Sequence, residues 1–177
     1  MIIKNKSFFI LFFLIFLVFS SKDVSSQTKV GYIDSKKIID GMQDSRDAKA
    51  RLDNQVTEWQ TELKVLQDSL QSVKDDFEKK KLILTDQLKE QTETQIKDLE
   101  TRVTSFRTEK FGENGEYFQK QTEYMKPVLD KVFKAIEEVA NEGNYDYVFD
   151  RSSEIMLLYV NENYDLTLKV INTLEGK

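Results

Sequence analysis

The stretch that decides the fold runs from Leu52 to Phe77 and reads LDNQVTEWQTELKVLQDSLQSVKDDF. Its apolar residues recur in steps that alternate between four and three, which is the spacing of a coiled-coil seam. The residues between them are mostly Glu, Gln, Asp, Lys and Ser, so the apolar stripe is narrow. The predicted seam comprises Leu52, Val56, Trp59, Leu63, Leu66, Leu70, Val73 and Phe77.

A shorter apolar series, again in threes and fours, follows at Ile96, Leu99, Val103 and Phe106. A single helix over residues 44–142 would be about 150 Å long, because each residue adds about 1.5 Å. Its stripe would then have no partner within the chain. We therefore expect residues 44–142 to form a long antiparallel coiled-coil hairpin, or arm, whose tip lies in the polar stretch Thr85 to Gln95.

The strongest helix-breaking signal lies later, in the stretch Phe111-Gly112-Glu113-Asn114-Gly115. A tip at this point would pair a very long outgoing helix with a short return helix, and most of the seam would stay unpaired. We therefore interpret the two glycines as a joint in the return helix, with a tip at this position as the alternative. Pro127 suits either the first turn of a helix or a kink. The candidate hinge residues are Gly112, Gly115 and Pro127.

Strand signals lie on both sides of the arm. Residues 29–34 are apolar on both alternating faces and indicate a short buried strand. Residues 145–150 alternate like a strand, and residues 155–160 are apolar throughout after a link that suits a hairpin. A final amphipathic helix follows Asp165. Residues 27–43 and 143–177 are thus predicted to form a β-rich body. So small an apolar sheet needs partners, which favours oligomerisation. The expected oligomerisation residues are Val30, Tyr32, Ile33, Tyr147, Phe149, Met156 and Leu158.

The first 26 residues have the pattern of a secretory signal peptide, cleaved before Gln27. Lys4 and Lys6 precede an apolar run from Phe8 to Phe19, which is shorter than the roughly 20 residues that a membrane-spanning helix needs. An uncleaved membrane anchor is the alternative. The chain has no cysteine, so it offers neither disulfides nor a site for lipid attachment. We expect export to the periplasm without stable membrane insertion.

Composition excludes several classes of function. The chain has no histidine and no cysteine, which removes the usual general base, the thiol nucleophile and most transition-metal sites. Of its 26 basic and 31 acidic residues, 23 and 30 remain after residues 1–26 are removed, a net charge of −7 that argues against nucleic-acid binding. We expect no enzyme activity and no cofactor.

Several apolar residues fall outside the predicted seam and are candidate contacts for a bound protein. The opposing interpretation, which the pattern supports equally well, is that some of them pack between the helices of the arm. The basic run Lys79-Lys80-Lys81 is interpreted as solvated helix surface, because nearby acidic residues balance it. The candidate contacts are Val65, Leu82, Ile83, Phe111, Tyr117 and Phe118.

The order of these elements resembles the Skp/OmpH family of periplasmic chaperones over the whole of the chain after the signal peptide. The resemblance rests on four stretches of sequence. They are the strand Lys29 to Asp34, the return-helix pattern Lys126-Pro127-Val128-Leu129-Asp130-Lys131-Val132, the junction Gly143-Asn144-Tyr145-Asp146-Tyr147-Val148-Phe149-Asp150, and the ending Tyr164-Asp165-Leu166-Thr167 with Val170-Ile171 and Leu174.

This resemblance implies a jellyfish-shaped homotrimer, in which three helical arms hang from a shared β body around a cavity. It also implies a holdase that keeps unfolded outer-membrane β-barrel proteins from aggregating without ATP. The best-known members are strongly basic whereas this chain is acidic, which leaves contact with lipid or lipopolysaccharide open. The rival hypothesis is a structural coiled-coil protein of the envelope, or an assembly subunit, without general chaperone activity.

Overall fold

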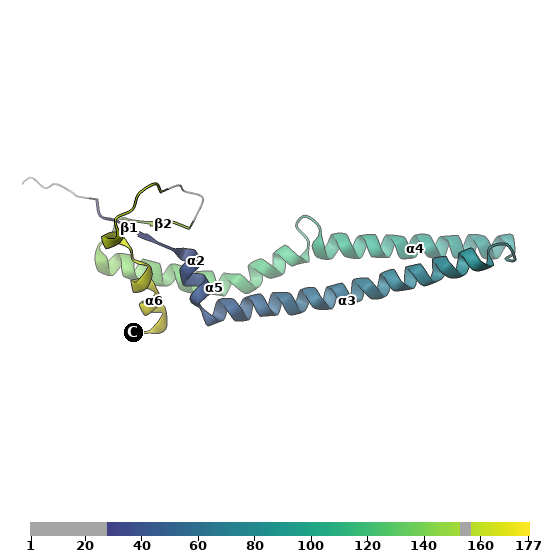
Figure 1. The fold of residues 1–177 in the computed structure, drawn as a ribbon, viewed down its shortest axis with the longest axis horizontal. Coiled ribbons are helices and arrows are strands. Elements are labelled where there is room, and N and C mark those ends of the chain that lie inside the picture. The colour runs from purple at the N-terminus through teal and green to yellow at the C-terminus, as the bar shows by residue number, and fades with distance from the viewer. Residues whose placement is uncertain (1–27, 153–156) are drawn as a thin grey trace, which may run out of the picture.

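The computed structural model describes residues 28–152 and 157–177, so the predicted signal peptide lies outside the described residues. A small body stands at one end and a long helical arm extends from it (Figure 1). Among the residues described, no helix is long and apolar enough to cross a membrane. The elements are β1 (Val30–Ile33), α2 (Ser35–Gly41), α3 (Gln43–Lys80), α4 (Asp86–Phe111), α5 (Glu116–Gly143), β2 (Tyr147–Asp150), the 3-10 turn η1 (Glu162–Tyr164) and α6 (Thr167–Glu175).

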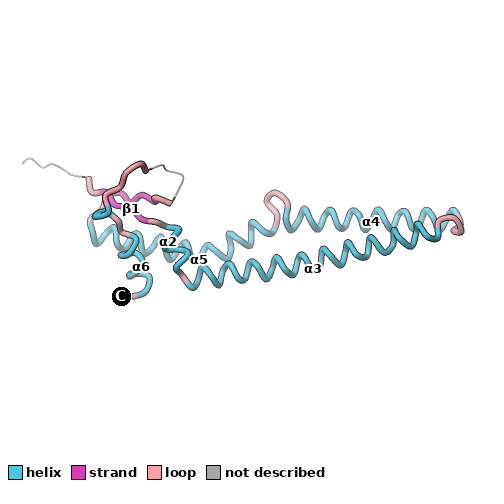
Figure 2. The backbone as a smooth tube through the Cα atoms, in the orientation of Figure 1, coloured by secondary structure: helices cyan, strands magenta, loops and turns pink. Residues whose placement is uncertain are grey.

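The arm consists of α3 on one side and of α4 followed by α5 on the other, as Figure 2 shows. The chain reverses at residues 81–85, whereas the sequence predicted the tip within Thr85 to Gln95. The prediction placed the tip too late because it took polar residues to indicate a turn. Thr85 instead caps α4, where its hydroxyl oxygen accepts a hydrogen bond from Leu88 N at 3.4 Å. The Gln, Glu and Lys residues that follow favour a helix.

One strand of the body, β1, precedes the arm in the sequence, and the other, β2, follows it. The two pair in parallel, with Val30 opposite Tyr147 and Tyr32 opposite Phe149. The predicted hairpin between residues 145–150 and 155–160 is wrong for its described part, because residues 157–160 form no strand. Ile155 and Met156 lie outside the described residues. The free edge of β1 instead meets the chain before α6, where Leu166 N donates to the Tyr32 carbonyl oxygen at 2.8 Å.

The core of the body lies beneath this sheet, between α2, α5 and α6. Figure 1 shows α5 running from the arm into the body without a break, so one helix contributes to both. Gly31 permits close packing here, since a Cβ atom at this position would lie 2.6 Å from Leu166 Cδ1. The buried core comprises Ile33, Ile38, Val132, Ala135, Val139, Leu166 and Val170.

Candidate functional site

The predicted seam faces the return helices along the whole of α3. Leu52 and Trp59 are buried, and the other six seam residues are half-buried. From the return side, Leu99 and Val103 of α4 are buried against α3. The seam side chains therefore pack between the two sides of the arm, although the half-buried ones keep part of their surface exposed. Burial of each large apolar side chain contributes on the order of 2 kcal/mol.

Trp59 is the best-buried residue of the seam, with 5% of its surface exposed. Its ring meets that of Phe111 edge to face, with the ring centroids 5.9 Å apart. Phe111 is the last residue of α4, so this contact lies where the return side changes from α4 to α5. Phe111, a candidate client contact from the sequence, is half-buried by this arm packing.

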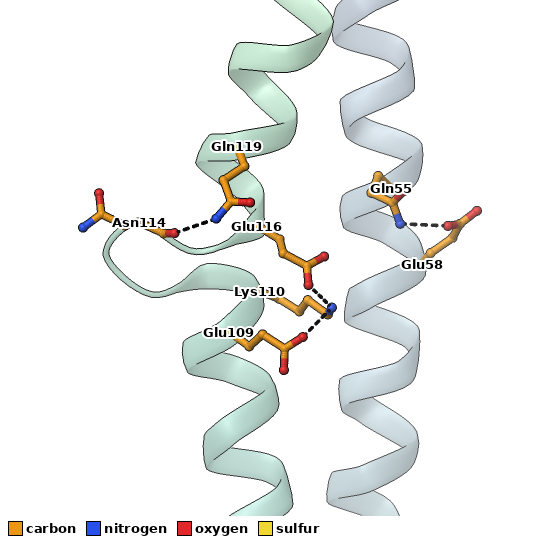
Figure 3. A network of polar contacts seen from close by, with 7 residues as sticks. All are labelled: Gln55, Glu58, Glu109, Lys110, Asn114, Glu116 and Gln119. Atoms are coloured by element: carbon orange, nitrogen blue, oxygen red, sulfur yellow. Dashed lines mark hydrogen bonds and ion pairs between the residues drawn. The ribbon is translucent and has the colours of Figure 1, made fainter.

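A half-buried lysine completes the cluster around Trp59. Lys110 Nζ lies 2.5 Å from a Glu116 carboxylate oxygen and 3.0 Å from one of Glu109, and its side chain is only 14% exposed. The same ammonium group lies 5.6 Å from the ring centroids of both Trp59 and Phe106. The hydrogen bond with Glu116 raises the pKa of Lys110, so the group stays charged although burial opposes it. We call the ion pair between Lys110 and Glu116 the latch (Figure 3).

The predicted joint is a compact loop at residues 112–115 that bulges away from α3 (Figure 3). Its glycines are needed for close backbone contacts, because a Cβ atom at Gly112 would lie 2.4 Å from the Thr108 carbonyl oxygen. At Gly115 it would lie 2.9 Å from that of Glu109. Asn114 takes a left-handed conformation with φ 63°, which asparagine tolerates better than most residues. Pro127 lies inside α5, not in its first turn, and is exposed.

The other candidate contacts differ in exposure. Val65 on α3 is 63% exposed, and Leu82 and Ile83 at the tip are 91% and 84% exposed. On the return side Phe118 is exposed, whereas Tyr117 is half-buried and packs edge to face on the Phe118 ring. Val65, Leu82, Ile83 and Phe118 thus present apolar surface that the arm itself does not cover. Charged and polar side chains surround them on all three helices.

The outer face of the sheet carries a second apolar surface. The paired positions place Val30 and Tyr147, and likewise Tyr32 and Phe149, on one face. The rings of Tyr147 and Phe149 stack with centroids 6.5 Å apart, yet these residues are 60% and 40% exposed. Beside them lies an open hollow of about 670 Å³ lined also by Leu157, Tyr159, Val160 and Tyr164. We call this surface, with the exposed Leu158 next to it in the chain, the outer face.

The predicted oligomerisation residues therefore divide into two groups. Ile33 points into the core of its own chain, while Val30, Tyr147 and Phe149 remain exposed on the outer face. Tyr32 shares that face but is only 5% exposed. Leu158 is 90% exposed, and Met156 lies outside the described residues. The alternation along β1 and β2 separates the two groups, because successive side chains point to opposite faces of a sheet.

Asp150 ties the end of β2 to the start of α2. Its carboxylate accepts hydrogen bonds from Ser35 N at 3.1 Å and from Ser35 Oγ at 2.5 Å. Ser152 donates through its backbone nitrogen at 3.0 Å and its hydroxyl at 2.8 Å. Burial raises the pKa of Asp150, but the hydrogen bonds from Ser35 and Ser152 outweigh it, so the pKa is lowered overall. The ionised carboxylate therefore stabilises the body.

Replacing Asp150 with asparagine is expected to lower the free energy of unfolding by about 1–2 kcal/mol at neutral pH, because charged hydrogen bonds are lost from a half-buried site. The pKa is depressed in the folded chain, so this stabilisation is present above about pH 4 and disappears as the pH falls further. Urea unfolding at several pH values measures the difference between wild type and variant. A difference that persists at pH 2 would contradict this role of the carboxylate.

Sequence reasoning missed both the latch and the Asp150 hydrogen bonds. Lys110 and Glu116 stand at the two ends of the glycine-containing stretch and carry opposite charges, which was a usable signal for the latch. The bonds between Ser35 and Asp150 join residues on opposite sides of the arm, and no local pattern predicts such a pairing. Within the described residues, no group of three or more acidic side chains is arranged to hold a metal ion.

Comparison with known proteins yields one family and one fold. The family model described as Outer membrane protein (OmpH-like) matches residues 29–174. No curated protein matches the sequence. The structure is similar to a crystal structure from Caulobacter crescentus CB15, described as a candidate outer membrane chaperone (OmpH-like), with a TM-score of 0.70 and 17% identity. The match covers 84% of this chain and 85% of that one. At this identity the likeness is one of fold.

Proposed function

The chain belongs to the OmpH-like family of outer membrane proteins, and on this basis we propose that it is a periplasmic holdase chaperone. In this role it would bind unfolded outer-membrane β-barrel proteins and prevent their aggregation in transit, without ATP and without a cofactor. The observation that carries the proposal is the apolar surface on an otherwise charged arm, at Val65, Leu82, Ile83 and Phe118.

The arrangement of these residues suits a protein that holds clients loosely. Each exposed aliphatic side chain offers on the order of 1–2 kcal/mol when a client covers it. Several such contacts spread along an arm add up to useful affinity, while no single one fixes the client's conformation. The surrounding charges keep the free arm soluble. Exchangeable contacts of this kind match unfolded chains, which have apolar segments but no defined shape.

We further propose that three copies assemble through the outer face, so that three arms surround a common cavity. Tyr147, Phe149 and Leu158 would leave an unusually apolar surface in water if the chain stayed alone. Both β1 and β2 are only 4 residues long, too little for a sheet to be stable by itself. Strands contributed by two further copies would extend the short sheet, and their aromatic rings would cover the exposed apolar surface.

The purified chain from Gln27 onward should keep a denatured outer-membrane β-barrel protein soluble when it is diluted from urea, as light scattering measures. The double variant Leu82→Ser with Ile83→Ser is expected to weaken this protection several-fold, because it removes the most exposed apolar pair. Both side chains lie in the turn at the tip and contribute little to the packing of the arm.

The matched control is Lys79→Ser with Lys80→Ser. It alters the same end of the arm but keeps Leu82 and Ile83. This variant is expected to protect as well as wild type. If the lysine variant loses protection and the aliphatic variant keeps it, capture is electrostatic and the apolar mechanism is wrong. If the wild-type chain gives no protection at all, the structural role without chaperone activity is favoured.

A further inference from the structure

One side of the arm is a single unbroken helix, whereas the other side is interrupted by a loop. On one side α3 runs unbroken from Gln43 to Lys80. On the other side the backbone leaves the helix after Phe111 and re-enters it at Glu116. Figure 3 shows the loop at residues 112–115 projecting away from α3, opposite an uninterrupted stretch of that helix. The arm therefore contains a break in one of its two helical paths only.

A break on one side affects how the arm can bend. Two packed helices have axes about 8–10 Å apart, so a bend of about 30° requires the outer path to be about 5 Å longer than the inner one. A hydrogen-bonded helix cannot lengthen by this amount without losing its bonds. A loop of four residues can, because such a segment spans up to about 13 Å when extended. The loop thus permits bending with α3 on the inside of the curve.

The latch opposes this lengthening. Lys110 lies in the last turn of α4 and Glu116 is the first residue of α5, so their 2.5 Å ion pair ties together the two ends of the loop. The Lys110 side chain is only 14% exposed, and its ammonium group lies 5.6 Å from the ring centroids of Trp59 and Phe106. Shielding strengthens an ion pair relative to exposed ones such as that between Lys64 and Asp68, whose side chains are 72% and 64% exposed.

We propose that residues 112–115 are a slack segment that lets the arm bend toward α3, and that the latch between Lys110 and Glu116 holds the arm straight. Opening the latch lets the loop lengthen. α4 then moves together with the half of α3 that lies toward the tip of the arm. Trp59 remains the contact around which the two halves turn, because it packs on Phe111 at the border of the loop. This bending is a property of the single chain and does not require a client.

The distance between spin labels on either side of the loop tests this mechanism. The chain has no native cysteine, so labelled cysteines are introduced at the exposed positions Thr104 on α4 and Gln121 on α5. In K110M and in E116Q, pulsed electron–electron double resonance should give a broader distance distribution than in the wild-type background. Its mean should be longer by up to about 5 Å, the path difference of a 30° bend.

Two controls separate bending from other changes. K64M breaks an exposed ion pair on α3 and should leave the distribution unchanged. Labels at Gln91 and Thr104, both on α4, should keep their distance in every variant. Unchanged distributions in both latch variants would overturn the proposal. So would a shift to shorter distances, which would place the bend on the opposite side, or an altered distance within α4, which would indicate melting of that helix.

Discussion

Replacing Trp59 with alanine is expected to lower the free energy of unfolding by about 3–5 kcal/mol, the range found when a large buried aromatic side chain is removed. Trp59 is 5% exposed and packs on Phe111, and its ring also faces the Lys110 ammonium group. The substitution therefore opens a cavity and removes a ring from beside a half-buried charge. Thermal and urea unfolding followed by circular dichroism measure the loss.

The matched control lies on the same helix. Val65→Ala shortens a side chain that is 63% exposed and should change the free energy of unfolding by no more than about 0.5 kcal/mol. Trp59→Phe keeps an aromatic ring opposite Phe111 and should recover much of the loss. A Trp59→Ala variant as stable as Val65→Ala would show that the arm does not depend on this cluster.

If copies assemble through the outer face as proposed, replacing Phe149 with aspartate is expected to convert the assembly to single chains. Phe149 lies on the outer face, stacked on Tyr147 and opposite Tyr32 in the paired strand. An unpaired carboxylate buried in an apolar interface costs several kcal/mol, and each 1.4 kcal/mol is about a tenfold loss in affinity. In the separated chain the same carboxylate would remain in water and cost little. Mass measured by light scattering during size-exclusion chromatography reports the change.

Phe118→Asp is the control for this substitution, because Phe118 is 48% exposed against 40% for Phe149 but lies on the arm. It should leave the assembled mass unchanged. If wild type is itself a single chain, or if Phe149→Asp stays assembled while Phe118→Asp dissociates, the outer face is not the surface through which the copies meet. Circular dichroism should confirm that both variants keep their helical content.

The family and the mainly helical composition with a small sheet were predicted from the sequence and are confirmed. The helical composition depends on local periodicity, since the alternating steps from Leu52 to Phe77 select a helix whatever the rest of the chain does. The position of the turn was predicted less well. Polar residues are compatible with both helix and loop, so composition alone did not locate the boundary that Thr85 sets as a helix cap.

The pairing of the strands could not be predicted from adjacent sequence. Two strand-like segments separated by a short link indicate a hairpin, and residues 145–150 and 155–160 have this pattern. The partner of β2 is instead β1, which lies on the far side of the arm. Similarly, the sequence around Lys110 is typical of a polar helix surface, and its half-buried position depends in part on Trp59, which comes from α3.

The parallel sheet also constrains the order in which the chain can fold. β1 is synthesised before the arm, but its partner begins at Tyr147, after the whole arm has been made. A strand pair so distant in sequence forms slowly unless the intervening chain is first shortened. Pairing of α3 with α4 provides this shortening through contacts that are closer in sequence. We therefore expect the arm to fold before the body, so that a nascent chain acquires its long helices before its two strands pair.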